Sequence, residues 1–416
     1  RVLQAANGTL RFIYDDAWRA SPDALPLSVS MPLSAAEHGH DTISAWLWGL
    51  LPDSERTLDH YGRLFGVSPR NPVALLAHIG ADCAGAVQFA PPEQADEFLA
   101  SASQRRRVTW LTEREVGQEL RSARERGVPG TDARTLGQFS LAGAQPKIAL
   151  LHDAGRWGTP HGRTPTTHIL KPPSREFPGF AENEHFCLTL ARALGLAAAS
   201  SRVQWFGDEV AIIVQRYDRV RRGSAYHRVH QEDTCQALAV MPTRKYENQG
   251  GPGIADIVAL LRDVSSESTE DIARFLDAAI LNWVLAATDA HAKNYSLLIG
   301  RQALVRLAPF YDMASYLPYA DTALHRVRLA MQVGGEYLVR RITPAHWLDA
   351  ARRAGLEPDV LAGALERQLA ALPEAIERTR IAAISDGLDA QVINALADRV
   401  AARTRECSAM QQKRLG

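Results

Sequence analysis

The chain has 416 residues, a length that allows two or three domains with a sizeable core. Its 47 lysines and arginines equal its 47 aspartates and glutamates, so no net charge draws it to nucleic acid or to an anionic membrane. The four cysteines show no CxxC spacing, which argues against a zinc site and a disulfide framework. No apolar run approaches the roughly 20 residues that cross a bilayer, and nothing after Arg1 looks like a signal peptide, so we expect a cytoplasmic protein.

Strand and helix patterns alternate at the start of the chain. We expect strands at 10–14 and 86–89, and helices at 43–50 and 72–79. Polar residues at 91–97 and 101–104 then suit a linker or an exposed crossing.

From 108 to 217 strand patterns dominate, interrupted by one helix at 182–194 with Gly195 as its expected C-cap. The expected strands are 147–151, 167–171, 203–206 and 209–215. Beyond 229 the helical period appears at 254–261, 270–286, 344–354, 360–372 and 388–405. A β-rich half followed by a helical half predicts an α+β, bilobal, protein-kinase-like fold with ATP between the lobes.

Two acids and an amide in the helical half have the spacing of phosphoryl-transfer enzymes. Asp289 and Asn294 lie close enough in sequence to surround one site, where the acid accepts a hydroxyl proton and the amide oxygen binds Mg²⁺. Asp312 would add the charged ligand that Mg²⁺ prefers. The alternative is that Asp289 and Asn294 cap a helix after the apolar run 278–287, and this segment alone leaves both interpretations open.

Other parts of a kinase follow in the expected order. The small residues at 139–147 precede a strand, so their backbone N–H groups could approach phosphates, although an ordinary turn is the alternative. Lys171 ends a strand and Glu184 lies on the next helix, where kinases pair a lysine with a glutamate. Glu182 is an alternative partner for Lys171. The simpler interpretation is that Lys171 and these glutamates are solvated surface charges. Residues 215–217 end the last strand, where a hinge would hold adenine.

Several motifs in order resemble those of the HipA family, the serine/threonine kinase toxins of bacterial toxin–antitoxin modules. They are 140–147 (SLAGAQPK), 166–171 (TTHILK), 182–184 (ENE), 231–236 (QEDTCQ), 245–247 (KYE), 250–253 (GGPG), 288–294 (TDAHAKN) and 309–312 (PFYD). The resemblance implies a HipA-type N-terminal subdomain at 1–98, a β-rich kinase lobe with the phosphate loop at 99–217, and an all-α kinase lobe at 218–416.

The resemblance also implies roles for individual residues, with ATP and Mg²⁺ as cofactors. Asp289 is the implied catalytic base, and Asn294 and Asp312 are the implied Mg²⁺ ligands. His291 stands where protein kinases often carry a lysine that touches the γ-phosphate, and Lys293 is a second charge there. Ser140 is the implied autophosphorylation site, whose modification inactivates the kinase. The implied ATP-binding residues are Ser140, Ala142, Gly143, Ala144, Gln145, Lys147, Lys171, Glu184, Gln215, Tyr217 and Lys293.

One departure from the family pattern is Pro146, which replaces an acidic residue and removes one backbone N–H from the loop. The implied partners are a HipB-like helix-turn-helix antitoxin, operator DNA through that antitoxin, and a protein substrate such as an aminoacyl-tRNA synthetase, whose phosphorylation arrests growth or causes persistence. No membrane partner is implied. The basic clusters 105–107 and Arg219 with 221–222 could touch DNA or tRNA, and solvated arginines are the alternative.

Three other functions stay open at this stage. A small-molecule kinase of the aminoglycoside or choline type shares an Asp-x-His-x-x-Asn run, but the motifs at 231–233 and 245–247 favour HipA. A non-catalytic co-repressor acting with an antitoxin is the second, which the full set of catalytic residues argues against. A metal-dependent hydrolase is the third, and it lacks the dense His and Asp cluster that two metals need.

Overall fold

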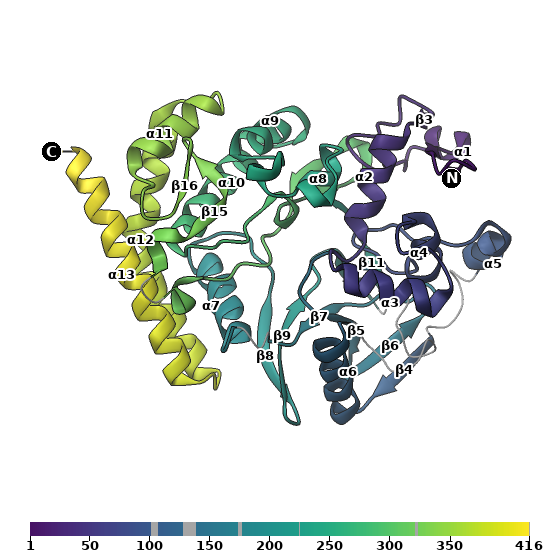
Figure 1. Cartoon of the computed structure of the whole chain (residues 1–416), viewed down its shortest axis with the longest axis horizontal. Helices are drawn as coiled ribbons and strands as arrows, with labels where there is room; N and C mark the ends of the chain where they lie inside the picture. Colours follow the sequence, from purple (N-terminus) through teal and green to yellow (C-terminus); the bar gives the residue numbers. More distant parts are fainter. Residues whose placement is uncertain (101–106, 128–138, 174–176, 224, 321–322, 416) are drawn as a thin grey trace. The chain divides into compact units, whose positions relative to one another are not determined.

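The computed structural model describes residues 1–100, 107–127, 139–173, 177–223, 225–320 and 323–415. The chain forms two compact units (Figure 1). The first unit contains Arg1–Glu176, Arg202–Thr243 and Leu298–Ala303, and the second contains Phe177–Ser201, Arg244–Leu297 and Leu304–Gly416. These units do not coincide with the three expected domain ranges, since the helix after residue 177 belongs with the second unit.

The N-terminal part of the first unit is a small α/β layer. Strands β1 (Val2–Gln4), β2 (Leu10–Ile13) and β3 (Glu37–His38) form an antiparallel sheet, which is followed by helices α2 (His40–Leu50), α3 (Glu55–Phe65) and α4 (Pro72–Ile79). Asn71 accepts the first backbone N–H groups of α4, and Pro72 occupies its first turn, so this helix begins where the sequence predicts. Trp46, Leu47 and Leu76 are fully buried in the core of this layer. The short helix α1 (Asp16–Arg19) has no buried residue, and a second short helix, α5, spans Ala95–Ala100.

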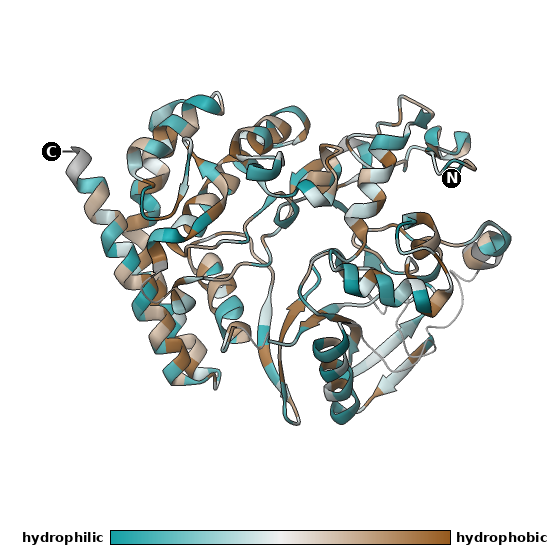
Figure 2. Ribbon diagram, viewed as in Figure 1, coloured by the Kyte–Doolittle hydropathy of each residue, from teal (hydrophilic) through white to brown (hydrophobic). Residues whose placement is uncertain are grey.

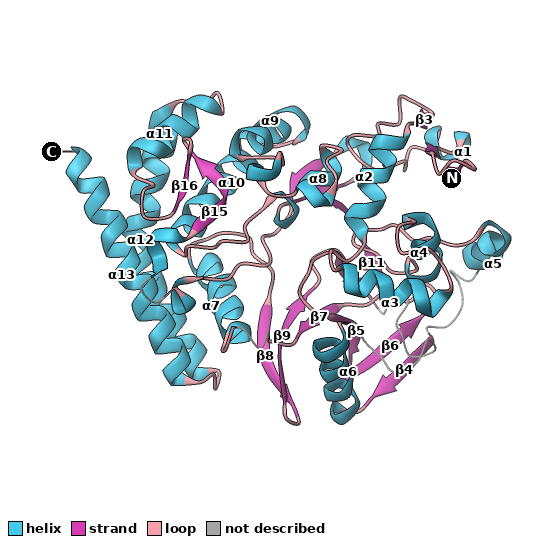
Figure 3. Cartoon of the chain, in the orientation of Figure 1, coloured by secondary structure: helices cyan, strands magenta, loops and turns pink. Residues whose placement is uncertain are grey.

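A six-stranded sheet forms the rest of the first unit, in the order β4-β6-β5-β7-β9-β8 (Figure 3). Its strands are β4 (Arg107–Leu111), β5 (Ile148–Asp153), β6 (Arg156–His161), β7 (His168–Lys171), β8 (Ser201–Phe206) and β9 (Glu209–Gln215). Helix α6 (Glu113–Arg126) packs Val116 and Leu120 against sheet residues such as Leu150 and Ile213. Figure 2 shows the contrast between the largely hydrophilic α6 and the hydrophobic β9. A methyl group at Gly117 would lie 2.5 Å from the Phe206 carbonyl oxygen, so glycine permits this close packing.

Short elements complete the first unit. The hairpin of β10 (Arg219–Arg222) and β11 (Ala225–Arg228) follows β9, and then come β12 (His230–Asp233) and α8 (Thr234–Ala237). Asp233 and Gln236 form a reciprocal capping box at the start of α8.

Helices dominate the second unit (Figure 3). They are α7 (Phe180–Ala193), α9 (Ile254–Val264), α10 (Ser268–Val284), α11 (Pro344–Arg353), α12 (Pro358–Ser385) and α13 (Ala390–Leu415). Trp283 of α10 and Trp347 of α11 are fully buried and meet edge to face, with ring centroids 5.9 Å apart. No helix in the described ranges is long and apolar enough to span a membrane.

Three expectations need correction. The range 218–416 is not all-α, because it also contains β10 to β12, β13 (Ser296–Ile299), β14 (Val305–Leu307), β15 (Arg328–Val333) and β16 (Glu336–Leu338). Residues 86–89 form no strand, since Gly85 adopts a φ of +75° in a turn and the Phe89 N–H bonds back to the Gly80 carbonyl. The helix predicted at 360–372 continues through Pro373 to Ser385. The α+β, kinase-like fold class itself is confirmed by the relatives described below.

Candidate active site

The segment after α10 curls into a closed loop around Asp289. The Asn294 side-chain amide donates to the Asp289 carbonyl at 2.6 Å, and the His291 N–H donates to the same carbonyl at 2.8 Å. Helix α10 ends at Val284 with Leu285 as its C-cap, so neither Asp289 nor Asn294 caps it. The capping interpretation is therefore wrong for this helix, and the spacing brings the acid and the amide to one place.

The Asp289 carboxylate is the exposed part of this loop. Its side chain is 64% exposed, whereas His291, Lys293 and Asn294 are buried. The Tyr246 hydroxyl donates to Asp289 Oδ1 at 2.5 Å, and His291 Nε2 lies 3.6 Å from the same oxygen. A carboxylate that is accessible on an otherwise buried loop can accept a proton from an incoming hydroxyl group.

His291 contributes to the loop as a neutral ring. Burial lowers the pKa of His291 to about 4, although the negative charge of Asp289 opposes that shift. The ring packs edge-on against Tyr246 with centroids 5.0 Å apart, and its Nδ1 atom has no hydrogen-bond partner among the described residues. A neutral imidazole cannot supply the positive charge of the lysine that stands in this place in protein kinases, so the γ-phosphate contact stays a prediction.

Asn294 and Asp312 form the candidate Mg²⁺ pair. Because the Asn294 amide nitrogen donates to the loop, its oxygen is the atom that remains for a cation. The Tyr311 hydroxyl donates to the Lys293 carbonyl at 2.8 Å and lies 2.6 Å from Ser296 Oγ, which ties the residue before Asp312 to the same loop. The charge of Asp312 also acts on the pKa of His291. An amide oxygen and a carboxylate fit Mg²⁺, which takes few protein ligands beside water and phosphate oxygens.

Asp312 has a left-handed backbone, with a φ of +56°. This conformation costs roughly 1–2 kcal/mol for most residues, and Asp tolerates it better than bulkier ones. In the described ranges, no three His, Cys, Asp or Glu side chains gather as a possible metal site.

In the first unit, the predicted phosphate loop docks on the N-terminal region. The Ser140 hydroxyl donates to the Leu50 carbonyl at 2.9 Å, and the Ser140 N–H donates to the Asp82 carbonyl at 3.1 Å. The Asp53 N–H donates to the Gly143 carbonyl at 3.2 Å. Ser140 is consequently only 1% exposed.

The loop is closed from within by Lys147, whose ammonium group donates to the Ala142 carbonyl at 2.6 Å. Gly143 has a φ of +106°, and a methyl group there would lie 2.5 Å from Lys147 Nζ, so the position requires glycine. Ala144, Gln145 and Pro146 complete the turn before β5.

Lys171 and Glu184 are both buried, so neither is the solvated charge that the simpler interpretation expects. Asn183, beside Glu184 on α7, holds the backbone of Ser315 with two hydrogen bonds of 2.7 and 2.9 Å. Lys171 belongs to the first unit and Glu184 to the second, so their predicted ion pair stays a prediction.

The predicted hinge begins where β9 ends. Gln215 pairs with His168 of β7, and the Arg216 N–H donates to the Thr167 carbonyl at 3.0 Å. The Tyr217 hydroxyl donates to the Gln231 side chain. The predicted adenine contacts of Gln215 and Tyr217 stay predictions.

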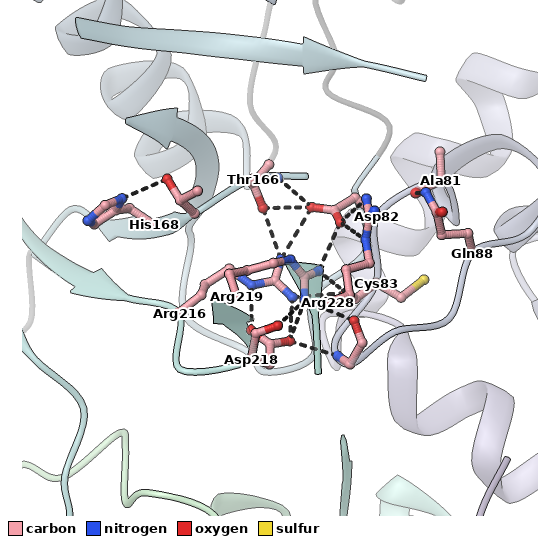
Figure 4. A network of polar contacts seen from close by, with 12 residues as sticks. Ala81, Asp82, Cys83, Gln88, Thr166, His168, Arg216, Asp218, Arg219 and Arg228 are labelled. Carbon is pink, nitrogen blue, oxygen red and sulfur yellow. Dashed lines mark hydrogen bonds and ion pairs between the residues drawn. The ribbon is translucent and has the colours of Figure 1, made fainter. Parts of the chain in front are cut away.

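A buried ionic cluster joins this hinge to the N-terminal region, and sequence reasoning missed it. Arg216, Arg219 and Arg228 converge on Asp82, and the first two also bind Asp218 (Figure 4). The cluster residues Asp82, Arg216, Asp218 and Arg219 are almost fully buried. Burial alone would raise the pKa of Asp82, but the three guanidinium groups outweigh it and hold the pKa far below its usual range.

The cluster corrects the expectation that Arg219 could touch DNA or tRNA. Arg219 is buried in it and cannot contact nucleic acid, whereas Arg221 and Arg222 of β10 are exposed. Of the other basic run, Arg105 and Arg106 lie outside the described residues, and Arg107 is exposed at the start of β4. Nothing in the local sequence marks Asp82, because its partners lie far away along the chain.

Comparison with known proteins identifies the family. Residues 1–90 match the family model of the HipA N-terminal domain, and residues 139–376 match that of the HipA-like C-terminal domain. The chain belongs to the HipA family. The resemblance to the HipA family is therefore confirmed, and the match over residues 1–90 falls within the range 1–98 expected for an N-terminal subdomain, whose bounds stay a prediction.

Relatives match this HipA-family chain over nearly its full length. The protein named "Putative kinase Y4mE" from Sinorhizobium fredii is 35% identical, over 97% of this chain and 95% of its own. "Serine/threonine-protein kinase toxin HipA" from Shewanella oneidensis is 29% identical, over 90% of this chain and 85% of its own. A solved structure of Shewanella oneidensis HipA with HipB and operator DNA has a TM-score of 0.84 at 25% identity, covering 99% of this chain and 96% of that one. The prediction of a kinase of this family is confirmed.

Proposed function

We propose that this HipA-family chain is an ATP- and Mg²⁺-dependent serine/threonine protein kinase and the toxin of a toxin–antitoxin pair. The observation that carries the proposal is the closed loop from Asp289 to Asn294, which presents one accessible carboxylate and one amide oxygen beside Asp312. The kinase name of the Shewanella relative and its match over 90% of this chain support the same activity.

In the proposed reaction, Asp289 orients a serine or threonine hydroxyl of the substrate and finally accepts its proton. Asn294 and Asp312 would hold Mg²⁺, which neutralises the charge that develops on the transferred phosphoryl group. Lys171 would contact the ATP phosphates, and the loop of Ala142 to Lys147 would cover them. His291 is a buried ring that packs edge-on against Tyr246.

We propose a HipB-like helix-turn-helix antitoxin as the partner, because Shewanella HipA has been solved with HipB and operator DNA. A chain with equal numbers of basic and acidic residues would reach operator DNA through that partner rather than by its own charge. We further propose a cytoplasmic location and a translation component, such as an aminoacyl-tRNA synthetase, as the protein substrate.

Ser140 is proposed as the site of inactivating autophosphorylation. Its hydroxyl is bonded to the Leu50 carbonyl and buried, so the loop must leave its docked position before the hydroxyl can be modified. A phosphoserine carries close to two negative charges and does not fit a hydroxyl-sized site between backbone groups. Phosphorylation would therefore keep the loop undocked and ATP poorly held.

The proposal is tested by a phosphoproteome comparison of cells that express the wild-type chain or Asp289→Asn. We expect new phosphoserine or phosphothreonine sites, including one on a translation protein, with the wild type alone. Growth arrest without any new phosphoprotein would favour the small-molecule kinase or the co-repressor.

A further inference from the structure

The segment at 245–247 carries a family motif for which the proposed reaction gives no role. Tyr246 of this segment is half-buried and donates its hydroxyl to Asp289 Oδ1 at 2.5 Å. A hydrogen bond to a carboxylate is among the stronger ones in proteins, typically worth about 1.5–3 kcal/mol. The phenol is therefore a specific partner of the proposed catalytic base.

The backbone around Tyr246 is fixed on both sides. The Lys245 carbonyl accepts the Ala292 N–H at 3.3 Å, which joins the segment to the Asp289 loop. On the other side, the Glu247 carboxylate accepts the N–H and the side-chain amide of Gln332, each at 2.6 Å.

A tight turn adds to this anchoring. The Gly251 N–H donates to the Tyr246 carbonyl at 3.0 Å, and a methyl group at Gly251 would lie 2.0 Å from the Arg244 carbonyl oxygen. Only glycine fits there. These contacts of residues 245–247 and Gly251 hold the Tyr246 phenol in place without any bound substrate.

Asp289 needs such a partner because its side chain is 64% exposed. An exposed carboxylate can rotate among several orientations, whereas a general base must point at the hydroxyl it serves. We infer that Tyr246 is a positioning residue, which holds Oδ1 of Asp289 so that the other oxygen faces the acceptor hydroxyl. This inference rests on the proposed function.

If Tyr246 blocked Asp289 rather than positioning it, Tyr246→Phe would raise kcat instead of lowering it. If the phenol instead occupied the place of the acceptor hydroxyl, it would block the base, and its removal would raise the rate. The sign of the change in kcat separates positioning from blocking.

The test uses Tyr246→Phe, which keeps the ring against His291 and removes only the hydroxyl. Tyr319→Phe is the control, because the Tyr319 hydroxyl also donates one hydrogen bond, to the Pro178 carbonyl at 3.1 Å in the same unit, and it accepts a longer one from Asn183 at 3.4 Å. Phosphoryl transfer from radiolabelled Mg·ATP is measured to two acceptors, dephosphorylated casein and the Asp289→Asn form of this chain. Binding of a non-hydrolysable ATP analogue with Mg²⁺ is measured by calorimetry.

We expect Tyr246→Phe to lower kcat by about 10- to 100-fold, the range that one hydrogen bond to a charged group predicts. The KM for ATP and the affinity for the analogue should stay within about twofold of wild type, and Tyr319→Phe should match wild type throughout. An unchanged or higher kcat in Tyr246→Phe overturns the inference. So does an equal loss of analogue affinity, which would indicate a merely structural role.

Failure of the proposed function has a different signature. If Asp289→Asn transfers phosphate like wild type, or if wild type modifies neither acceptor, the kinase proposal fails. If Asp289→Asn is inactive and Tyr246→Phe is fully active, the kinase proposal stands and only the role of Tyr246 is lost.

Discussion

Along the loop of Asp289, one exposed residue is followed by the buried run from His291 to Asn294. His291, two positions after the exposed Asp289, is 4% exposed. Its lowered pKa makes it a base that the folded chain keeps neutral, while the unfolded chain protonates it at mildly acidic pH. Folding stability must therefore depend on pH through this residue.

The direction of this pH dependence follows from the difference in bound protons between the unfolded and the folded state. Because burial lowers the pKa of His291 from 6.5 to about 4, the unfolded state binds the extra proton between those values and stability falls as the pH drops. At pH 5 the cost is about 2 kcal/mol relative to pH 7.5. We expect His291→Gln to lose that part of the acid sensitivity, measured by urea unfolding at both pH values. An identical pH dependence in the variant and the wild type would contradict this account.

Among the helices and strands, the sequence predicts those that have clear capping residues or a continuous apolar run. Helix α4 and strand β9 have the predicted bounds, because Asn71 and Pro72 start the helix and a continuous apolar run fills the strand. Helices α3 and α6 were not predicted, since their many charged residues hide the apolar face that packs inward.

The candidate site likewise has a part that local sequence predicts and a part that it does not. Spacing in one segment was enough to find Asp289 and Asn294 together, but the contact of Tyr246 with Asp289 and the cluster around Asp82 join distant segments. Local spacing holds no information on such contacts, because the fold of the intervening chain creates them.

Asp82 connects the end of β9 and strand β10 to the loop that contains Ser140. The Asp82 carboxylate accepts hydrogen bonds from Arg216 of the hinge and Arg219 of β10, while its carbonyl oxygen accepts the N–H of Ser140. We expect Asp82→Asn to destabilise the first unit by about 3–5 kcal/mol, because it leaves buried arginines without their counter-charge.

Glu37→Gln is the control for this variant. It removes a charge from the exposed Arg11–Glu37 pair in the same unit and should cost at most about 1 kcal/mol. Urea unfolding compares the two variants, and equal costs would show that the cluster contributes no more than a surface pair.

Across its full length, the chain matches HipA-family models over residues 1–90 and 139–376, and it carries no formal net charge. Its N-terminal region supplies Leu50, Asp53 and Asp82 as hydrogen-bond partners of the predicted phosphate loop. We infer that this region holds the predicted phosphate loop in the conformation seen here.

The proposed autophosphorylation of Ser140 would take place between two molecules of the chain. Because Ser140 is buried while its loop is docked, we expect one molecule to modify the undocked loop of another, at a rate per molecule that rises with protein concentration. Mass spectrometry of the chain incubated with Mg·ATP at several concentrations measures that rate. A rate per molecule that does not depend on concentration would indicate modification within one molecule instead.

Single-turnover transfer from radiolabelled Mg·ATP by Asp289→Asn shows most directly whether Asp289 is the base of the proposed phosphoryl transfer. The substitution keeps the shape of the side chain and removes the proton acceptor. We predict unchanged binding of Mg·ATP and a rate about 100- to 10,000-fold below wild type, the usual contribution of a general base. Transfer by Asp289→Asn at a rate near that of wild type would contradict that role.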